Sequence, residues 1–446
     1  MRVIIIGAGK TGFNIAKILT EENYDVVLIE KEEEQVQNLE EHLDVQVLIG
    51  NGVRRSMLEK AGIEEADLLV AVTESDEVNL IACMVAKTYG TVRTVARVRN
   101  PEYAFESRRR KGTFPGIDFL INPELVTAKE IVKLIDIPEA LDVVYYAEGK
   151  IQLLELKIPE TAPVAKRQIK DLKLDYPFLI VAIVREGDII IPRGNDFINP
   201  DDIIFVLAKT KEMIEVERFL GTERKRAERV MILGGNYASY HLARILESKK
   251  YAVKIIEKNY NKCVELAKHL DNTMVLHGDA TDINFLTNEG IGDVDVFVCL
   301  ADDDKLNLLV SLIAKNSGVK RTIAQVGRSD YIALMENVGI DVGISPRTLT
   351  ANKILRFIHK GHDIISVALL SNENAEMTEL LISKKSPVAH RKLKDLNFPA
   401  GSLVGSIYRK NQVIIPKGED VIKPGDSVTI FALPEVATKA IKYITG

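Results

Sequence analysis

The sequence predicts an α/β protein in which two Rossmann-like, doubly wound parallel-sheet domains alternate with two small α+β domains. Three observations carry this prediction. A strand, a glycine-rich turn and a helix start stand at residues 2–21. The first half of the chain recurs in the second half at an offset of about 227 residues. Within each half, the spacing of apolar residues changes after about 135 residues.

The internal repeat covers nearly the whole chain, which makes two halves of about 220 residues each. RVIIIGAGKTGFNIAKIL at 2–19 recurs as RVMILGGNYASYHLARIL at 229–246. Later segments match as well: INPELVTAKEIVKLI with ISPRTLTANKILRFI, APVAKRQIKDL with SPVAHRKLKDL, and IIIPRGNDFINPDD with VIIPKGEDVIKPGD. A repeat on this scale indicates that one structural unit occurs twice.

The first part of each half alternates short β-branched runs with amphipathic stretches of helical length. In the first half we expect strands at 2–6, 25–30, 45–49, 67–72 and 93–98, and helices near 12–21, 32–42, 54–61 and 76–88. Continuous apolar strands that alternate with helices are typical of a parallel sheet covered on both faces.

The second part of each half has short strands, Pro/Gly turns and one short helix. In the first half the expected strands are 143–147, 151–157, 178–184, 188–191 and 202–208, and the pattern recurs at about 363–443. A charged stretch, TERKRAER at 222–229, is the expected linker between the halves. The expected domains are 1–136, 137–221, 222–358 and 359–446.

Composition excludes several classes of protein. The 446 residues are 46% apolar and 28% charged, with a net charge of −5, which argues against electrostatic capture of nucleic acid. Three cysteines are too few for a disulfide framework and fit a reducing compartment. No stretch approaches the ~20 apolar residues that span a bilayer. The start of the chain does not have the pattern of a signal peptide.

The first half predicts a nucleotide crevice. Gly7 allows a tight turn, Gly9 lets the backbone approach a diphosphate, and Gly12 lets the helix pack closely on the strand. The helix start would then direct its N–H groups at the phosphates. Glu30 ends the second strand, where a carboxylate can bind a ribose diol and favours NAD over NADP. The alternative is a structural glycine turn beside an ordinary acidic residue.

Other polar positions lie at the carboxyl ends of strands, where ligands bind in open α/β sheets. Residues 50–52 (Gly-Asn-Gly) end the third strand and are placed to lie beside an adenine. Thr73 ends the fourth strand, and Asp76 is expected to cap the next helix. Arg97 ends the fifth strand, where it can reach a phosphate. For Thr73 and Asp76, a helix start without ligand contact is an equal alternative.

The second half keeps only part of this pattern. Gly234 retains the first glycine, but Asn236 and Ser239 stand at the second and third glycine positions. Ala301 replaces Thr73, and Gln325 replaces the cationic Arg97. Two interpretations stay open: a pocket that binds adenosine through Glu257 and Asp279, or a vestigial pocket.

No residue pattern indicates catalysis. The expected domain at 137–219 contains neither His nor Cys, and no nucleophile or P-loop motif occurs in the chain. The acidic run at 302–304 favours a helix start over a metal site. The basic run at 107–111 is more typical of a solvated helix face than of a partner site. Binding without catalysis is therefore the preferred interpretation.

The chain resembles two fused RCK (regulator of potassium conductance) units and is similar to the TrkA family of regulatory subunits of Trk potassium uptake systems. The resemblance rests on GAGKTG (7–12), GNG (50–52), AVTESDEVNLIACMVA (71–86), ARVRNPEY (96–103), IEKNY (256–260), GDA (278–280) and the doubled PVA…KDL segments. It implies a first NAD site at Gly7, Ala8, Gly9, Lys10, Thr11, Gly12, Glu30, Asn51, Gly52, Thr73 and Arg97. It implies a second nucleotide site at Gly234, Gly235, Asn236, Tyr237, Ala238, Glu257, Asp279 and Ala280.

The resemblance also implies function. NAD or NADH is the expected cofactor, with ATP and ADP as further candidates. The expected partner is an integral-membrane, TrkH-like potassium channel subunit, beneath which the protein forms a homo-oligomeric ring, a tetramer, at the cytoplasmic face of the membrane. Two other classes stay open: a soluble NAD-dependent oxidoreductase built on a duplicated Rossmann fold, and a sensor whose small domains bind a second ligand.

Overall fold

The fold is known from a computed structural model. It describes residues 1–21, 24–33, 36, 43, 45–90, 92–100, 103, 115–137, 140–221, 227–328, 330–359, 364–370 and 375–445. The chain forms two compact units, each built from two separate segments: 1–132 with 228–354, and 133–227 with 355–446. The boundaries of the four domains expected from the sequence stay predictions.

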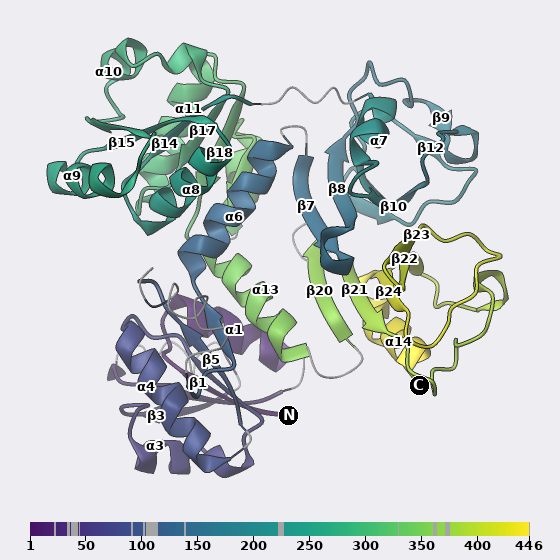
Figure 1. Cartoon of the computed structure of the whole chain (residues 1–446), viewed down its shortest axis with the longest axis horizontal. Coiled ribbons are helices and arrows are strands. Elements are labelled where there is room, and N and C mark those ends of the chain that lie inside the picture. Colours follow the sequence, from purple (N-terminus) through teal and green to yellow (C-terminus); the bar gives the residue numbers. More distant parts are fainter. Residues whose placement is uncertain are drawn as a thin grey trace. The chain divides into compact units, whose positions relative to one another are not determined.

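The first unit holds two six-stranded parallel sheets, drawn in purple to blue and in teal to green in Figure 1. The first sheet has the order β3-β2-β1-β4-β5-β6 and the second β16-β15-β14-β17-β18-β19. Both follow the strand order 3-2-1-4-5-6, which is the order of dinucleotide-binding folds. The predicted Rossmann-like fold class is confirmed.

The helices and strands that begin in this unit fall into two matching sets. The first set is β1 (Arg2–Ile6), α1 (Lys10–Glu21), β2 (Asp25–Glu30), β3 (Gln46–Ile49), α3 (Arg55–Lys60), β4 (Leu68–Ala71), α4 (Asp76–Ala86), β5 (Arg93–Arg97), β6 (Phe119–Ile121) and α6 (Pro123–Asp136). The second set is β14 (Arg229–Leu233), α8 (Tyr237–Ser248), β15 (Ala252–Glu257), α9 (Tyr260–His269), β16 (Met274–His277), α10 (Ile283–Asn288), β17 (Val296–Cys299), α11 (Asp304–Asn316), β18 (Arg321–Gln325), α12 (Asp330–Asn337), β19 (Val342–Ile344) and α13 (Pro346–His359).

The strands form because their side chains are apolar on both faces. Val3, Ile4 and Ile5 in β1 have no exposed surface, and all four residues of β4 are fully buried. Burial on both faces requires helices on both sides of the sheet, as expected for parallel strands.

No helix in the described part of the chain is long and apolar enough to cross a membrane.

Most expected elements of the first half are confirmed. The strands expected at 2–6 and 25–30 have the predicted bounds, and the other three differ by one residue at one or both ends. The helix expected near 12–21 begins at Lys10. The three-residue strand β6 was missed because so short a run shows no periodicity. The helix expected at 32–42 falls largely outside the described residues, as does the basic run at 107–111.

The second unit holds two five-stranded antiparallel sheets, with the orders β11-β10-β13-β8-β7 and β20-β21-β24-β22-β23. The first half contributes β7 (Ala140–Tyr146), β8 (Ile151–Lys157), β9 (Arg167–Gln168), β10 (Phe178–Arg185), β11 (Asp188–Ile190), β12 (Phe197–Ile198), β13 (Ile203–Lys209) and α7 (Met213–Leu220). The second half contributes β20 (Ile364–Leu370), β21 (Ala375–Leu381), β22 (Ser402–Arg409), β23 (Gln412–Ile414), β24 (Ser427–Ala432) and α14 (Pro434–Thr445).

The two antiparallel sheets share a core. One buried cluster contains residues of both halves, among them Leu153, Phe205, Met377 and Phe431. The rings of Phe205 and Phe431 lie 6.5 Å apart between centroids. Because each sheet also packs on its own helix, both of its faces are covered.

A buried ion pair recurs at the equivalent place in both antiparallel sheets. Arg185 binds Asp202 through two hydrogen bonds of 2.8 Å, and Arg409 binds Asp426 through two of 2.7 Å. The carboxylate also accepts a backbone N–H, from Asn199 in the first half, at 2.7 Å. The carboxylate is 1% exposed in each pair, so it depends on these donors.

We expect Asp202→Asn to lower the free energy of unfolding by about 2 kcal/mol or more, because it removes a charged acceptor from a buried carboxylate site. The matched control is the neighbouring Asp201→Asn. Asp201 pairs with Lys157 at 3.0 Å, but its side chain is 83% exposed, so the loss should stay below about 1 kcal/mol. Denaturant unfolding followed by circular dichroism measures both. Equal effects of the two substitutions would contradict the assigned role of the Arg185–Asp202 pair.

Candidate functional site

Two glycines of the turn between β1 and α1, Gly7 and Gly12, cannot be replaced by another residue without strain. Gly7 has a φ of 100°, in the left-handed region, and its N–H donates to Ile29 O at 2.9 Å. A Cβ on Gly12 would lie 1.9 Å from Gly7 O, so α1 packs directly on the turn. Gly7 and Gly12 therefore have the structural roles that their spacing predicts.

Gly9 has a different environment. A Cβ on Gly9 would meet nothing within 4 Å, so open space lies over the turn at this point. Ala8, Gly9 and Thr11 line a cavity beside the start of α1. The backbone of Lys10 begins the helix, whereas its side chain lies outside the described part. A helix start that faces open space can accept an anion through its free N–H groups.

Glu30 holds the glycine turn in place. Glu30 is 8% exposed, and its carboxylate accepts the N–H of Ala8 at 2.5 Å. The other carboxylate oxygen accepts the N–H groups of Lys31 and Glu32 at 2.6 and 3.0 Å. An ionised carboxylate offers about four acceptor positions, so a ribose hydroxyl has room to join these donors.

The end of β3 brings Asn51 and Gly52 to the same edge of the sheet. Asn51 Oδ1 accepts the N–H of Val53 at 3.1 Å, which closes an Asx turn. A Cβ on Gly52 would lie 2.4 Å from Ile6 Cγ2, so only glycine fits against β1 here. The structure accounts for Gly52 by packing alone.

A buried asparagine ties the ends of β4 and β5 together. Asn79 has no exposed surface, and its Oδ1 accepts the N–H and the hydroxyl of Thr73, both at 2.8 Å. Its amide donates to Thr73 O at 3.0 Å and to Arg97 O at 2.9 Å. Asn307 makes the corresponding bonds to Ala301 and to the end of β18. Thr73 therefore holds the local structure, and its hydroxyl is already used.

Arg97 is a partly buried cation on the cavity wall. Its Nη1 donates to Thr73 O at 3.1 Å, whereas its Nε is buried and has no hydrogen-bond partner among the described residues. Burial lowers the pKa of the guanidinium, although Arg97 stays charged at neutral pH. A guanidinium with free donors is suited to a phosphate oxygen.

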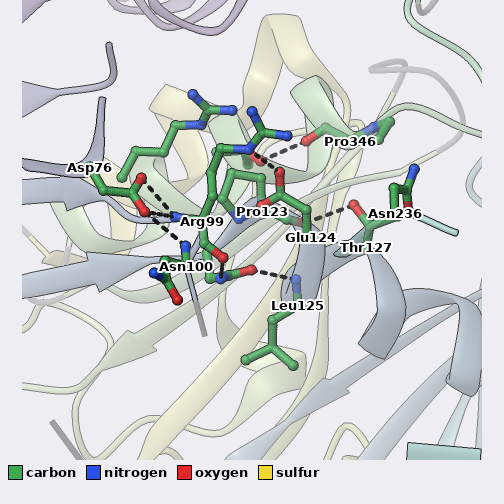
Figure 2. A network of polar contacts seen from close by, with 12 residues as sticks. Asp76, Arg99, Asn100, Pro123, Glu124, Leu125, Thr127, Asn236 and Pro346 are labelled. Atoms are coloured by element: carbon green, nitrogen blue, oxygen red, sulfur yellow. Dashed lines mark hydrogen bonds and ion pairs between the residues drawn. The ribbon is translucent and has the colours of Figure 1, made fainter. Parts of the chain in front are cut away.

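A second arginine on the same wall was missed by the sequence analysis. Arg99 Nε pairs with Glu124 Oε1 at 2.7 Å, and its backbone N–H donates to Asp76 at 2.9 Å. Asn100 N–H donates to the Asp76 carboxylate at 2.8 Å, and Figure 2 shows the bonds from the Arg99 and Asn100 backbone converging on Asp76. The spacing Arg97-x-Arg99 along one strand end was a signal for this pair.

The expectation that Asp76 caps α4 is wrong. The capping residue is Ser75, whose Oγ accepts the N–H of Val78 at 3.3 Å, and the Asp76 carboxylate is directed to the end of β5. In the second half Asp303 caps α11, and Asp304 accepts the N–H of Gly327. Asp303 and Asp304 of the acidic run thus have structural roles at a helix start.

The second glycine turn keeps the backbone arrangement of the first. Gly234 has a φ of 99°, and its N–H donates to Ile256 O at 2.9 Å. Glu257 Oε2 accepts the N–H of Gly235 at 2.6 Å, and Oε1 accepts the N–H of Asn259 at 2.6 Å. Glu257 therefore holds this turn as Glu30 holds the first.

The start of α8 differs from that of α1 because Asn236 caps it. Asn236 Oδ1 accepts the N–H of Ser239 at 3.1 Å, and its amide donates to Leu300 O at 2.6 Å. The side chain occupies the N–H that a diphosphate would take. Ala238 is buried, whereas Tyr237 is 47% exposed. Asn236 and Ser239 thus replace the second and third glycines of the first half, and the Asn236 side chain satisfies an N–H group of the helix itself.

The end of β16 carries Asp279 and Ala280. Asp279 pairs with Lys258 at 2.8 Å, and this bond lowers the pKa of Asp279 to about 2. Its other oxygen accepts the N–H of Thr281 at 3.0 Å. Ala280 is buried in the core. Asp279 is therefore an ionised acceptor at the place where Asn51 stands in the first half.

A cavity of about 1900 Å³ in the first unit is lined by residues of both repeats. Of the expected site residues it collects Ala8, Gly9, Thr11, Arg97, Gly235, Asn236, Tyr237 and Ala238. Glu30, Asn51, Gly52, Thr73, Glu257, Asp279 and Ala280 do not line it. Other cations on its wall are Arg99, Lys262, Arg328 and Arg347. Among the described residues, no three His, Cys, Asp or Glu side chains gather in a way that could hold a metal ion.

Comparison with known proteins gives the following matches. The TrkA-N domain matches residues 3–123 and 230–346, and the TrkA-C domain matches residues 153–221 and 377–445. The Trk system potassium uptake protein TrkA homolog 1 of Methanosarcina mazei is 38% identical, over 99% of this chain and 100% of its own length. The Trk system potassium uptake protein TrkA of Halomonas elongata is 35% identical, over 97% of this chain and 96% of its own length.

Solved structures share the fold at low sequence identity. The RCK domain of GsuK superposes with a TM-score of 0.64 at 16% identity, over 99% of this chain and 94% of that chain. The GsuK channel bound to NAD gives the same TM-score and identity, over 99% of this chain and 78% of that chain. At this identity the likeness shows the fold alone.

Gly12 and Gly9 are expected to respond differently to replacement by alanine, which adds a methyl group. Gly12→Ala should lower the free energy of unfolding by about 1–3 kcal/mol, because its Cβ overlaps Gly7 O. Gly9→Ala should leave stability within about 0.5 kcal/mol but weaken NAD binding about tenfold or more, since the methyl group enters the open space over the turn. Thermal unfolding without ligand and calorimetric titration with NAD separate the two effects. A stable Gly12→Ala protein, or full NAD affinity in Gly9→Ala, would contradict this site.

Proposed function

This chain belongs to the TrkA family, and from that premise we propose that it is a nucleotide-binding regulatory subunit of a potassium uptake system. The observation that carries the proposal is the first crevice, where an open glycine turn, the carboxylate of Glu30 and the cation of Arg97 lie at one sheet edge. Relatives of high coverage are named Trk system potassium uptake proteins.

The first crevice suits a dinucleotide by its chemistry. The start of α1 would hold the diphosphate, Glu30 would accept the ribose hydroxyls, and Arg97 would supply a phosphate contact. Asn51 and Gly52 would lie beside the adenine. The site residues and the choice of NAD or NADH, with ATP and ADP as further candidates, are part of the proposal.

The proposed action is regulation rather than catalysis. The partner would be an integral-membrane, TrkH-like potassium channel subunit, beneath which the chain assembles as a homo-oligomeric ring, a tetramer, at the cytoplasmic face of the membrane. We keep the four-domain organisation, with boundaries after 136, 221 and 358, as part of this proposal.

A nucleotide can shift the channel only by binding one conformation of the regulatory subunit more tightly than another. A coupling free energy of about 1–3 kcal/mol would change channel opening from about fivefold to about 150-fold. The residues that face the cavity from both repeats give a ligand in the first crevice a means to act on the second repeat. Arg99 already experiences the charge of Asp302 from that repeat.

Potassium flux into vesicles that contain the membrane subunit and this chain tests the proposal. We expect NAD or NADH to change the flux several-fold with wild-type protein and to have no effect with Glu30→Lys, which places a cation against the glycine turn. The matched control is Glu257→Lys, since Glu257 makes the same bond to the second turn; it should keep the NAD response. Flux that is unaffected by NAD, NADH, ATP and ADP, or a full NAD response in Glu30→Lys, would overturn the proposal.

A further inference from the structure

The two repeats carry their arginines at different positions around the cavity. In the first repeat Arg97 and Arg99 stand at the end of β5, and Glu124 stands in the first turn of α6. In the second repeat Gln325 and Gly327 occupy the positions of the two arginines. The position of Glu124 is taken by Arg347, in the first turn of α13. The second repeat thus lacks both of these arginines at the strand end and has one additional arginine on the helix.

The guanidinium of Arg347 lies beside Gly327, which stands at the position of Arg99 in the first repeat. Its Nη2 is 3.1 Å from the point where a Cβ on Gly327 would lie. The backbone around this point is the same in both repeats, since Gly327 N–H donates to Asp304 at 2.8 Å as Arg99 N–H donates to Asp76. Arg347 therefore covers the position at which the Arg99 side chain begins in the first repeat, and it needs a glycine there to do so.

Arg347 also makes fewer polar contacts with the described residues than Arg99 does. Arg99 is held by Glu124 at 2.7 Å, whereas the guanidinium of Arg347 makes no hydrogen bond or ion pair with any residue that the structure describes. Asp304 attracts it at longer range, and burial lowers the pKa of this guanidinium without removing its charge. A partly buried guanidinium on a cavity wall that is paired with none of the described residues is suited to bind a phosphate.

The start of α8 cannot serve the same purpose. Asn236 already accepts the N–H of Ser239 and is itself held by Leu300 O. A phosphate in the second crevice therefore has to find its partner elsewhere. Glu257 ends β15 and Asp279 follows β16, and they supply the carboxylates that a ribose diol requires.

We propose that the second crevice binds a nucleoside phosphate whose phosphate group is held by Arg347 of α13 instead of by the helix start at the glycine turn. This inference rests on the proposed nucleotide-binding function and gives the second site a recognition mode of its own. Because the cation lies on α13 and the ribose acceptors lie at β15 and β16, the ligand would bridge the sheet and the helix that follows it.

The test compares ADP with adenosine, since only the former carries phosphate. In a full-length Glu30→Lys protein, which disables the first site, we expect ADP to bind at the second site. Addition of Arg347→Ala should weaken ADP binding about tenfold or more and leave adenosine binding unchanged. Arg347→Lys, which keeps the charge but loses the bidentate geometry, should fall between the two. Arg218→Ala, an exposed arginine on α7, is the matched control and should have no effect.

Each outcome decides a separate point. ADP binding that is unchanged by Arg347→Ala, or an equal loss of ADP and adenosine binding, would overturn the role of Arg347 as a phosphate ligand. Absence of ADP binding in Glu30→Lys, when the wild type binds ADP, would overturn the second site and leave the proposed function standing. Absence of nucleotide binding in the wild type would overturn the proposed function itself. Thermal unfolding without ligand, together with Arg347→Lys, identifies a loss that comes from misfolding.

Discussion

The structure of both crevices depends on one hydrogen bond, from the backbone of the glycine turn to the carboxylate that ends the second strand. Ala8 N–H donates to Glu30 in the first repeat, and Gly235 N–H donates to Glu257 in the second. A charge-assisted bond of this kind contributes about 1.5–3 kcal/mol. It fixes the turn relative to the neighbouring strand, which in turn aims the helix start at the carboxyl edge of the sheet. The same carboxylate is the expected ribose ligand, so support of the turn and ligand binding share one side chain.

The two repeats differ at the start of the helix that follows the glycine turn, which is α1 in the first repeat and α8 in the second. In the first repeat the turn is bare at Gly9, and the helix start faces a cavity. In the second, Asn236 caps the helix with its own side chain, and Ser239 occupies the tight packing position without surface exposure. The positions of the arginines differ as well. Arg97 and Arg99 stand at the strand end in the first repeat, whereas Arg347 stands on α13 in the second. The first crevice therefore has open space at the helix start, where a diphosphate would bind. In the second crevice the side chain of Asn236 accepts an N–H of the helix start instead.

Much of the fold was predictable because buried parallel strands leave continuous apolar runs. β1, β2 and β8 begin and end where the sequence predicts. In β8 the run Ile151–Leu154 is buried on both faces, but the apolar pattern does not tell which partner covers the second face. Here that partner is the sheet of the other repeat. The turn glycines and Glu30 were predictable from spacing because each has a backbone reason to be there. The pairing of Arg99 with Glu124 and the approach of Arg347 to Gly327 were not, because each joins segments that are apart in the sequence and leaves no local pattern.

We expect the first crevice to accept a dinucleotide and the second crevice, in which Asn236 caps the helix start, to exclude one. Equilibrium dialysis of NAD against the full chain measures how many molecules bind tightly. One NAD for each chain is expected, lost in Glu30→Lys and kept in Glu257→Lys. Two equivalent NAD molecules for each chain, or one that disappears with Glu257→Lys and survives Glu30→Lys, would contradict it.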